Sequence, residues 1–420
     1  MARPLLAALL VGCCSLALWS PLPYPEAAAG DWPQWRGPTR DGQDPGPSWP
    51  DSLQAPHLEL QWRVELGPSY SGPIVSGNRV FTTETVDRQR EVVRAYDRQA
   101  GKLLWQVSWD GAVSVPFFAK SNGDWIRSTP ACDGERLYVA GMRDLLVCLR
   151  AADGQELWRY DFVAQDKSPL PPFGFVCSPL VHDGAVYVQA GGGLVKLDAQ
   201  RGTVLWKSLA DGGGMEGSAF SSPILTEVGG RRQLVVQTRQ RLAGVEPERG
   251  EVLWSQDVPS FRGMNILTPL QVGSLFFTSA YGGKSFGYAV QPEADRFTVQ
   301  TSWENKVQGY MSTPVAIQGH AYLHLRNQRF TCLDLQTGAE KWTTPKTFGK
   351  YWSLVAQGER LLALDERGEL LLIQADPREF RLLDQRRISE QETWAHLAIS
   401  DGQLFVRELN ALSAYRWEKK

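Results

Sequence analysis

The chain has 420 residues, a formal net charge of −2 and scattered lysines and arginines, so nothing in its charge indicates a nucleic-acid or other polyanionic partner. Its six cysteines include no CxxC or CxxCH motif, which argues against thiol redox chemistry, zinc knuckles and c-type haem. The high counts of glycine, 40, and tryptophan, 16, are typical of a fold with many tight turns and packed indoles.

Residues 1–29 have the pattern of a secretory signal peptide. An apolar run from Leu5 to Trp19 follows one arginine, and three alanines precede Gly30 at an A-x-A cleavage site. We therefore expect an exported protein of the periplasm or cell envelope whose mature chain begins near Gly30. Two alternatives stay open: a lipobox ending at Cys13, which would be acylated and tether the protein to a membrane, or an uncleaved anchor.

Residues 30–57 form a Trp/Pro-rich segment without helix or strand periodicity. We expect Trp32 and Trp35 to lie against the following domain and cover one end of it. A second interpretation is that Arg36 and the two indoles form a ligand site.

A degenerate repeat fills the remaining residues, 58–420. The unit AYDRQAGKLLW, Ala95 to Trp105, recurs up to Trp158, Trp206, Trp254 and Trp342. Upstream of most copies lies a proline, an apolar pair and a glycine turn, as in SPLVHDGAVYV. Trp158 and Trp206 are 48 residues apart, as are Trp206 and Trp254. A period of about 40–50 residues with short alternating strands predicts the blades of a β-propeller.

Each repeat also predicts how neighbouring blades meet. The glycine supplies the positive φ of a turn and leaves a bare peptide that an indole of the adjacent blade can cover. We expect this docking for the following residues: Gly101, Trp105, Gly154, Trp158, Gly202, Trp206, Gly250, Trp254, Gly338 and Trp342.

The two ends of the repeat region complement each other. Leu58 to Leu66 reads as an outermost strand without its three partners, and His396 to Trp417 reads as three inner strands without a fourth. Together they predict an all-β propeller of eight four-stranded antiparallel blades, closed by the N-terminal strand joining the last blade. Seven blades is the alternative, because the repeat from Trp352 to Ile388 lacks its outer tryptophan.

Long loops before the innermost strands, at 107–126, 161–176 and 208–219, are expected to surround a central funnel. Several residues there are candidates for lining the funnel: Trp125, Phe175, Glu216, Asn265, Tyr310, Trp352 and Trp394. They predict either a site for a small ligand or peptide, or aromatic side chains that merely plug the channel.

The unit Ala95-x-Asp97-x-x-x-Gly101-Lys102-x-x-Trp105 resembles the docking motif of the PQQ-like propeller repeat family, and the resemblance covers residues 58–417. The DWPQWRGP leader also resembles that of exported bacterial members. The family includes scaffolds similar to BamB, the outer-membrane assembly lipoprotein, and quinoprotein dehydrogenases. The resemblance implies a PQQ-like propeller and leaves its function open.

The dehydrogenases of this family use PQQ, a Ca²⁺ held by Glu and Asn, a catalytic Asp and often an adjacent cysteine pair. Here the only such pair, Cys13-Cys14, lies in the leader, and Glu216 and Asn265 match the calcium ligands only loosely. We therefore expect a monomeric, non-enzymatic scaffold for protein or peptide partners, with no catalytic residues, metal or cofactor. A PQQ- and calcium-dependent alcohol or sugar dehydrogenase is the alternative.

One further motif has metal-ligand chemistry. His320 and His324 would share one face of a strand, but the HxxxH spacing chelates zinc from a helix and no third ligand is evident. We expect no zinc site there.

Overall fold

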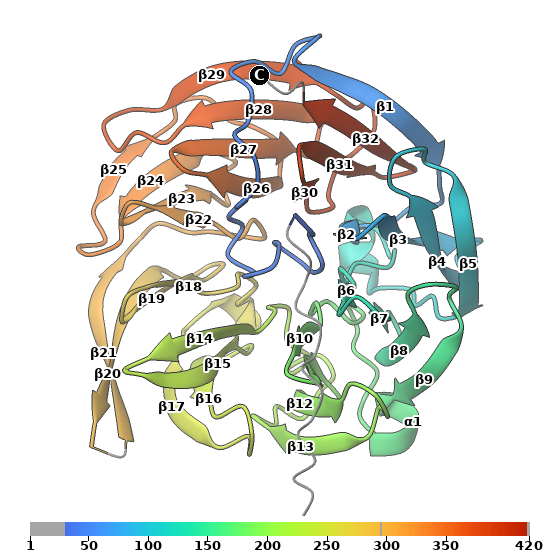
Figure 1. The fold of residues 1–420 in the computed structure, drawn as a ribbon. Coiled ribbons are helices and arrows are strands. Elements are labelled where there is room, and N and C mark those ends of the chain that lie inside the picture. Colours follow the sequence, from blue (N-terminus) through green and yellow to red (C-terminus); the bar gives the residue numbers. More distant parts are fainter. Residues whose placement is uncertain (1–29, 295, 418–420) are drawn as a thin grey trace, which may run out of the picture.

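The computed structural model describes residues 30–294 and 296–417, and they form a closed eight-bladed β-propeller (Figure 1). Every blade is a four-stranded sheet whose neighbouring strands run antiparallel. The eight-blade prediction is thereby confirmed, and the seven-blade alternative is wrong. Among the described residues no helix has the length and apolar character needed to cross a membrane.

The first four blades follow one another without interruption. Blade 1 contains β2 (Ile74–Ser76), β3 (Arg79–Val86), β4 (Arg90–Asp97) and β5 (Leu103–Asp110). Blade 2 contains β6 (Ala131–Cys132), β7 (Arg136–Gly141), β8 (Leu145–Arg150) and β9 (Glu156–Asp161). Blade 3 contains β10 (Leu180–His182), β11 (Ala185–Ala190), β12 (Gly193–Asp198) and β13 (Val204–Ser208). Blade 4 contains β14 (Ile224–Val228), β15 (Arg231–Gln237), β16 (Arg241–Val245) and β17 (Val252–Asp257).

The second half repeats the arrangement. Blade 5 contains β18 (Leu270–Val272), β19 (Leu275–Ser279), β20 (Ser285–Glu293) and β21 (Arg296–Asn305). Blade 6 contains β22 (Val315–Ile317), β23 (His320–His324), β24 (Phe330–Asp334) and β25 (Glu340–Thr343). Blade 7 contains β26 (Trp352–Gln357), β27 (Arg360–Asp365), β28 (Glu369–Gln374) and β29 (Arg381–Arg387). Blade 8 contains β30 (Ala398–Ser400), β31 (Gln403–Glu408), β32 (Ala411–Trp417) and β1 (Leu58–Glu65).

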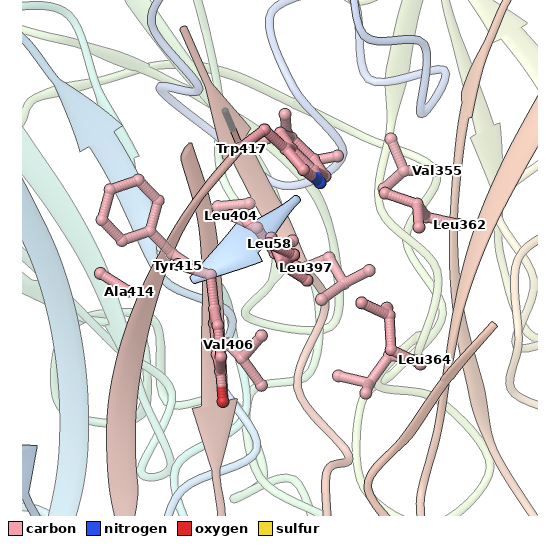
Figure 2. Close-up of a cluster of buried hydrophobic side chains, with 14 of the residues drawn as sticks. Leu58, Val355, Leu362, Leu364, Leu397, Leu404, Val406, Ala414, Tyr415 and Trp417 are labelled. Atoms are coloured by element: carbon pink, nitrogen blue, oxygen red, sulfur yellow. The ribbon is translucent and has the colours of Figure 1, made fainter. Parts of the chain in front are cut away.

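Blade 8 closes the ring, as the sequence predicted. Strand β1 pairs antiparallel with β32 from Leu58 opposite Trp417 to Glu65 opposite Ala411. The junction between blades 7 and 8 is filled by buried aliphatic residues of β27, β31 and β32, together with Leu58 (Figure 2). Since the first and last strands of the propeller lie in one sheet, the ring has no open seam.

In the part of the chain that the structure describes, helical structure is limited to short segments in the loops between blades. These are a 3₁₀ turn at Phe117–Asn122, α1 at Phe162–Asp166 and a 3₁₀ turn at Phe261–Gly263. The three turns follow the outer strands β5, β9 and β17, so they belong to the loops that lead from one blade into the next.

Indoles on the outer strands bridge neighbouring blades. The ring of Trp105 lies on Gly154 and its Nε1 donates to the carbonyl of Ala151 at 3.1 Å. The same pairing joins Trp62 to Gly101, Trp158 to Gly202, Trp206 to Gly250 and Trp303 to Gly338. Each of these glycines has a positive φ and would place a Cβ inside the facing indole.

Two of the expected docking tryptophans behave differently. Trp254 stays within its own blade, donating from Nε1 to Oε1 of Gln233 at 2.7 Å, because the β20–β21 hairpin that follows has no docking glycine. Trp342 donates to the carbonyl of Asp376 at 2.8 Å, at a turn without a glycine. Blade contacts there depend on ordinary side-chain packing, including Trp254 against Phe276 and Trp342 against Phe380.

The N-terminal segment, residues 30–57, runs across the centre of the ring and then outward over blade 7 to β1 (Figure 1). Trp32 is buried and forms an antiparallel bridge with Val75 of β2. Asp44 donates its backbone N–H to Ala356 of β26 at 2.8 Å. The segment thus satisfies backbone groups on the inner edges of blades 1 and 7.

Candidate functional site

The centre of the propeller is a funnel lined by one equivalent residue from each of the eight blades. In blades 1 to 6 a Gly, Ser or Thr followed by a proline comes just before the innermost strand. The lining residue stands two positions before that Gly, Ser or Thr, and blades 7 and 8 have a residue at the equivalent position. The eight residues are Tyr70, Arg127, Val176, Phe220, Ile266, Met311, Tyr351 and Trp394. With Phe173, Met264 and Tyr310 they enclose a cavity of about 230 Å³.

Below this upper tier lies a ring of hydroxyl groups that links blades 1 to 6, each to the next. The backbone N–H of Gly72 donates to Oγ1 of Thr129 at 3.0 Å, and that of Thr129 donates to Oγ of Ser178 at 3.1 Å. The relay continues through Ser222 and Thr268 to Thr313 in the same way. The Ser-Pro and Thr-Pro pairs of the repeat therefore hold the innermost strands at a fixed distance from the axis.

The N-terminal segment forms the floor of the funnel. Trp35 lines the cavity and contacts His396 edge-on, with ring centroids 5.9 Å apart. Arg36 is fully buried and donates to the carbonyls of Thr313 and Pro314 at 3.0 and 2.7 Å. Arg40 donates to the carbonyls of Ser178 and Pro179 at 3.0 and 2.7 Å, so two guanidinium groups anchor the floor to blades 6 and 3.

Arg36 has no guanidinium nitrogen left over for binding a ligand. Its three guanidinium nitrogens all donate to backbone carbonyls, and burial lowers its pKa to about 10, so it stays protonated at neutral pH. Arg36 faces a separate polar cavity on the other side of the floor, whereas Trp35 faces the funnel.

Aromatic side chains build two walls. On one side Tyr351 stacks on Trp394 with centroids 5.7 Å apart, and Tyr70 follows at 5.6 Å from Trp394. On the other side a ladder of four phenylalanines descends from the rim: Phe117, Phe118, Phe173 and Phe220, with successive centroids 5.6, 6.2 and 5.6 Å apart. The ladder connects an exposed loop to the funnel wall.

Arg127 is the charged side chain among the lining residues. Its Nε and Nη2 donate to the backbone carbonyls of Trp125 and Gly123 at 3.2 and 3.1 Å, and no carboxylate of the described residues pairs with it. Burial lowers its pKa to about 10, so the group remains a cation at neutral pH.

His396 lies at the floor beside Trp35, and its imidazole is neutral. Burial lowers its pKa to about 3, and its Nδ1 lies 3.1 Å from the carbonyl of Leu397, so Nδ1 carries the proton. Its Nε2 is buried without a partner and is left as an acceptor.

The predicted funnel residues are distributed differently from the expectation. Tyr310 and Trp394 line the cavity. Trp352, Asn265 and Phe175 are buried beside it, Trp125 lines another pocket, and Glu216 lies exposed in the loop before β14.

The discrepancy is a matter of strand register. Trp352 follows Tyr351 in the chain, and successive residues of an extended strand point to opposite sides. Trp352 therefore points into the junction of blades 6 and 7, where its Nε1 donates to Oδ2 of Asp365 at 3.0 Å, while Tyr351 faces the funnel. Asn265 and Phe175 are displaced in the same way by one residue from Ile266 and Val176.

Sequence reasoning missed Tyr70, Arg127, Phe220 and Tyr351 as lining residues. The signal was available in the sequence. Aligning the repeats on their five Ser-Pro or Thr-Pro pairs and on Gly72-Pro73, and then counting back two residues from the first member of each pair, gives six of the eight positions of the upper tier.

The residues present do not fit PQQ with calcium. The funnel lining contains no Asp, Glu or Asn, and the described residues include no group of three or more His, Cys, Asp or Glu side chains suited to a metal ion. The amide nitrogen of Asn265 donates to the carbonyls of Arg239 and Val258, away from the funnel. Cys13 and Cys14 lie outside the described residues, as does the whole expected signal peptide.

The histidine pair also lacks metal-site geometry. His324 is buried and stacks on Trp352 at 5.3 Å, with neither ring nitrogen hydrogen-bonded. Burial lowers its pKa to about 4, so the ring is neutral at pH 7. His320 instead lies 3.0 Å from the carbonyl of Gln318 at a turn.

Comparison with known proteins agrees with the fold. The outer membrane protein assembly factor BamB of Yersinia pestis is 22% identical over 297 residues, which is 67% of this chain and 69% of the relative. A polyvinylalcohol dehydrogenase from a Sphingopyxis species is 28% identical over 214 residues, 46% of this chain but 30% of the enzyme. The crystal structure of BamB from Moraxella catarrhalis superposes with a TM-score of 0.63 at 12% identity, covering 86% of this chain and 98% of that one.

The family assignment rests on a sequence profile of the whole family and not on one relative. The sequence profile described as outer membrane protein assembly factor BamB matches residues 89–344, which is more than half of the chain. The protein therefore belongs to the BamB family of PQQ-like β-propellers.

Proposed function

We propose that this protein is an exported, non-enzymatic scaffold that binds a polypeptide partner in the cell envelope through the loops around the funnel mouth. The observation that carries the proposal is the exposure of Phe117 and Phe118, whose side chains are 85% and 58% accessible. Exposed aromatic residues of this kind are uncommon on a monomer surface and are typical of binding sites.

Of the twelve large apolar residues that are exposed in the described chain, seven lie on outer strands and five lie in loops between blades. Phe117 and Phe118 lie between blades 1 and 2, Leu170 lies between blades 2 and 3, Met215 between blades 3 and 4, and Phe261 between blades 4 and 5. All four loops connect an outer strand to the next innermost strand, so they rise on the funnel side of the same half of the ring. This half offers a partner several apolar anchors on a rigid base.

Family membership supports the same function, since three of the relatives bear the name of an outer membrane protein assembly factor. The dehydrogenase relative is matched over 30% of its own length, and the funnel lacks residues for that family's calcium ion. We extend the assembly role to this chain as part of the proposal, together with its location in the periplasm or cell envelope.

Site-specific photo-crosslinking tests the proposal in the organism that encodes the chain. A benzoylphenylalanine at Phe117 should yield a discrete crosslinked protein, and the same probe at Leu382, on the outer strand β29, should not. The double variant Phe117→Ser/Phe118→Ser should fold normally yet fail to restore outer-membrane protein levels in a deletion strain. Equal crosslinking from both positions, or full complementation by the double variant, would show that the loops do not bind the partner.

A direct test separates the scaffold from the dehydrogenase. The mature chain, from Gly30, is titrated with PQQ and Ca²⁺ while oxidation of alcohols and aldoses is followed with a dye. We expect no calcium-dependent binding and no turnover; stoichiometric binding with turnover would replace the scaffold by the enzyme.

A further inference from the structure

Among the described residues that line the funnel, Arg127 is the one cation. Its Nε and Nη2 donate to backbone carbonyls of its own loop. Burial lowers its pKa, and the nearby charge of Asp124 raises that pKa in part without forming an ion pair with it. A half-buried cation of this kind is stabilised when an anion accepts its remaining N–H groups. The imidazole of His396, at the floor, contributes no charge because it is neutral.

The surroundings of that cation suit a flat apolar group. Tyr351, Trp394 and Tyr70 form a continuous aromatic wall that ends beside Arg127, since Tyr70 and Arg127 occupy the same position in adjacent blades. Aromatic rings pack against such walls in offset or edge-on geometry. The floor is aromatic as well, because Trp35 closes it.

The size of the cavity suits a ligand of one or two rings. An apolar cavity of roughly 150 Å³ is known to hold benzene, and this one measures about 230 Å³. A fused two-ring aromatic group therefore fits within it.

From this combination we infer that the funnel binds a small planar aromatic monocarboxylate, with its carboxylate on Arg127 and its ring against Tyr351, Trp394 and Tyr70. A single charge matches a single cation. A multiply charged quinone would leave carboxylates unpaired among aromatic side chains, at a cost of several kcal/mol for each ion. The inference is independent of the proposed function, because the funnel residues lie below the exposed loops.

The hydroxyl ring and His396 add polar contacts without changing the charge. The hydroxyls of Thr129 and Ser178 accept N–H bonds and retain a proton that they can donate to a ligand, whereas that of Thr268 donates to the carbonyl of Ser222. Nε2 of His396 is available to accept a hydrogen bond. A ligand with a phenolic or indole N–H group would satisfy that acceptor.

The test uses the mature protein and two probes that differ only in charge, 2-naphthoate and the neutral 2-naphthamide. Binding is followed by quenching of tryptophan fluorescence and by isothermal titration calorimetry. We expect naphthoate to bind at one site and about tenfold more tightly than the amide, which corresponds to about 1.4 kcal/mol for a charge-assisted hydrogen bond.

Variants separate the charge from the wall. Arg127→Gln should remove the preference for the carboxylate and leave the affinity for the amide within about twofold, and Arg127→Lys should restore part of it. Lys120→Gln removes an exposed cation from the same loop and should change neither affinity. Trp394→Ala should weaken both probes together.

Three results would overturn the inference: equal affinity for the two probes, an unchanged preference in Arg127→Gln, or no binding of naphthoate at millimolar concentration. Calcium-dependent binding of PQQ in preference to naphthoate would also overturn it. Loss of naphthoate binding leaves the crosslinking test untouched, because that test probes Phe117 on the rim, so the two proposals fail separately.

Discussion

Blade docking can be measured with a matched pair of glycine substitutions. Gly202 has a φ of +69°, and a Cβ there would lie 2.5 Å from two ring carbons of Trp158. Gly319 has a φ of +76°, but a Cβ there meets nothing within 4 Å. Changing either residue to alanine introduces the same left-handed strain, of about 1–2 kcal/mol. Only Gly202→Ala also displaces an indole from the neighbouring blade.

The extra cost of Gly202→Ala follows from what the indole loses. The Nε1 of Trp158 donates to the carbonyl of Ala199 at 3.0 Å, and such a bond contributes about 1 kcal/mol. Displacement of the ring also removes part of its packing on Tyr138, with centroids 6.0 Å apart. We expect Gly202→Ala to be less stable than Gly319→Ala by about 1–3 kcal/mol.

Thermal and urea unfolding followed by tryptophan fluorescence provide the measurement. For a chain of this length, 1 kcal/mol lowers Tm by about 1–2 °C, so the two variants should differ by about 1–5 °C. If both variants lose the same stability, indole packing on the glycine contributes nothing beyond the backbone strain, and the docking argument fails.

Three further predictions concern the floor, the buried imidazole and the chain start. Arg36→Met removes the donor to the carbonyls of Thr313 and Pro314. It should lower the free energy of unfolding by about 2–4 kcal/mol and expose the floor to trypsin cleavage after Arg40. Cleavage at the wild-type rate would contradict this. The pKa of His324 is about 4 when folded and about 6.5 when unfolded, so the unfolded state binds more protons and stability falls as pH decreases from about 6.5 to 4. His324→Phe keeps the ring stack on Trp352 and should remove up to about 3 kcal/mol of this loss of folding stability at low pH. The measurement is the urea midpoint, which should change less between pH 7 and pH 4 in the variant than in the wild type. An identical pH profile of the two proteins would refute the prediction. Intact mass of the exported protein should place the first residue at Gly30, whereas an acylated Cys13 would reveal the lipoprotein pathway.

The number of blades was accessible from the sequence because it depends on local features. An alternating strand, a turn glycine and a tryptophan four residues after that glycine repeat along the chain. Each of these features reports on the structure close to it in the sequence. Even the closure by β1 and β32 was predictable, since an outer strand without partners and three strands without a fourth complete each other. Trp254 was the exception, because its docking depends on the next blade having a turn glycine.

The lining of the funnel was not accessible in the same way. The alternation of side chains along a strand separates two faces, but it does not say which face points to the axis. The prediction was therefore off by one residue: it named Trp352 and Asn265, whereas Tyr351 and Ile266 line the funnel. The contacts of the floor join residues nearly 280 positions apart, such as Arg36 and Pro314, and the sequence carries no periodic signal for them.

The sequence alone thus determined the architecture, because blades are local units that repeat and close on one another. Only the tertiary structure decided which side chains meet at the axis. There eight blades converge on a segment with no repeat of its own, and Arg127 comes to face an aromatic cavity without a carboxylate partner. The local pattern repeats around the ring, but the centre depends on all of the blades at once.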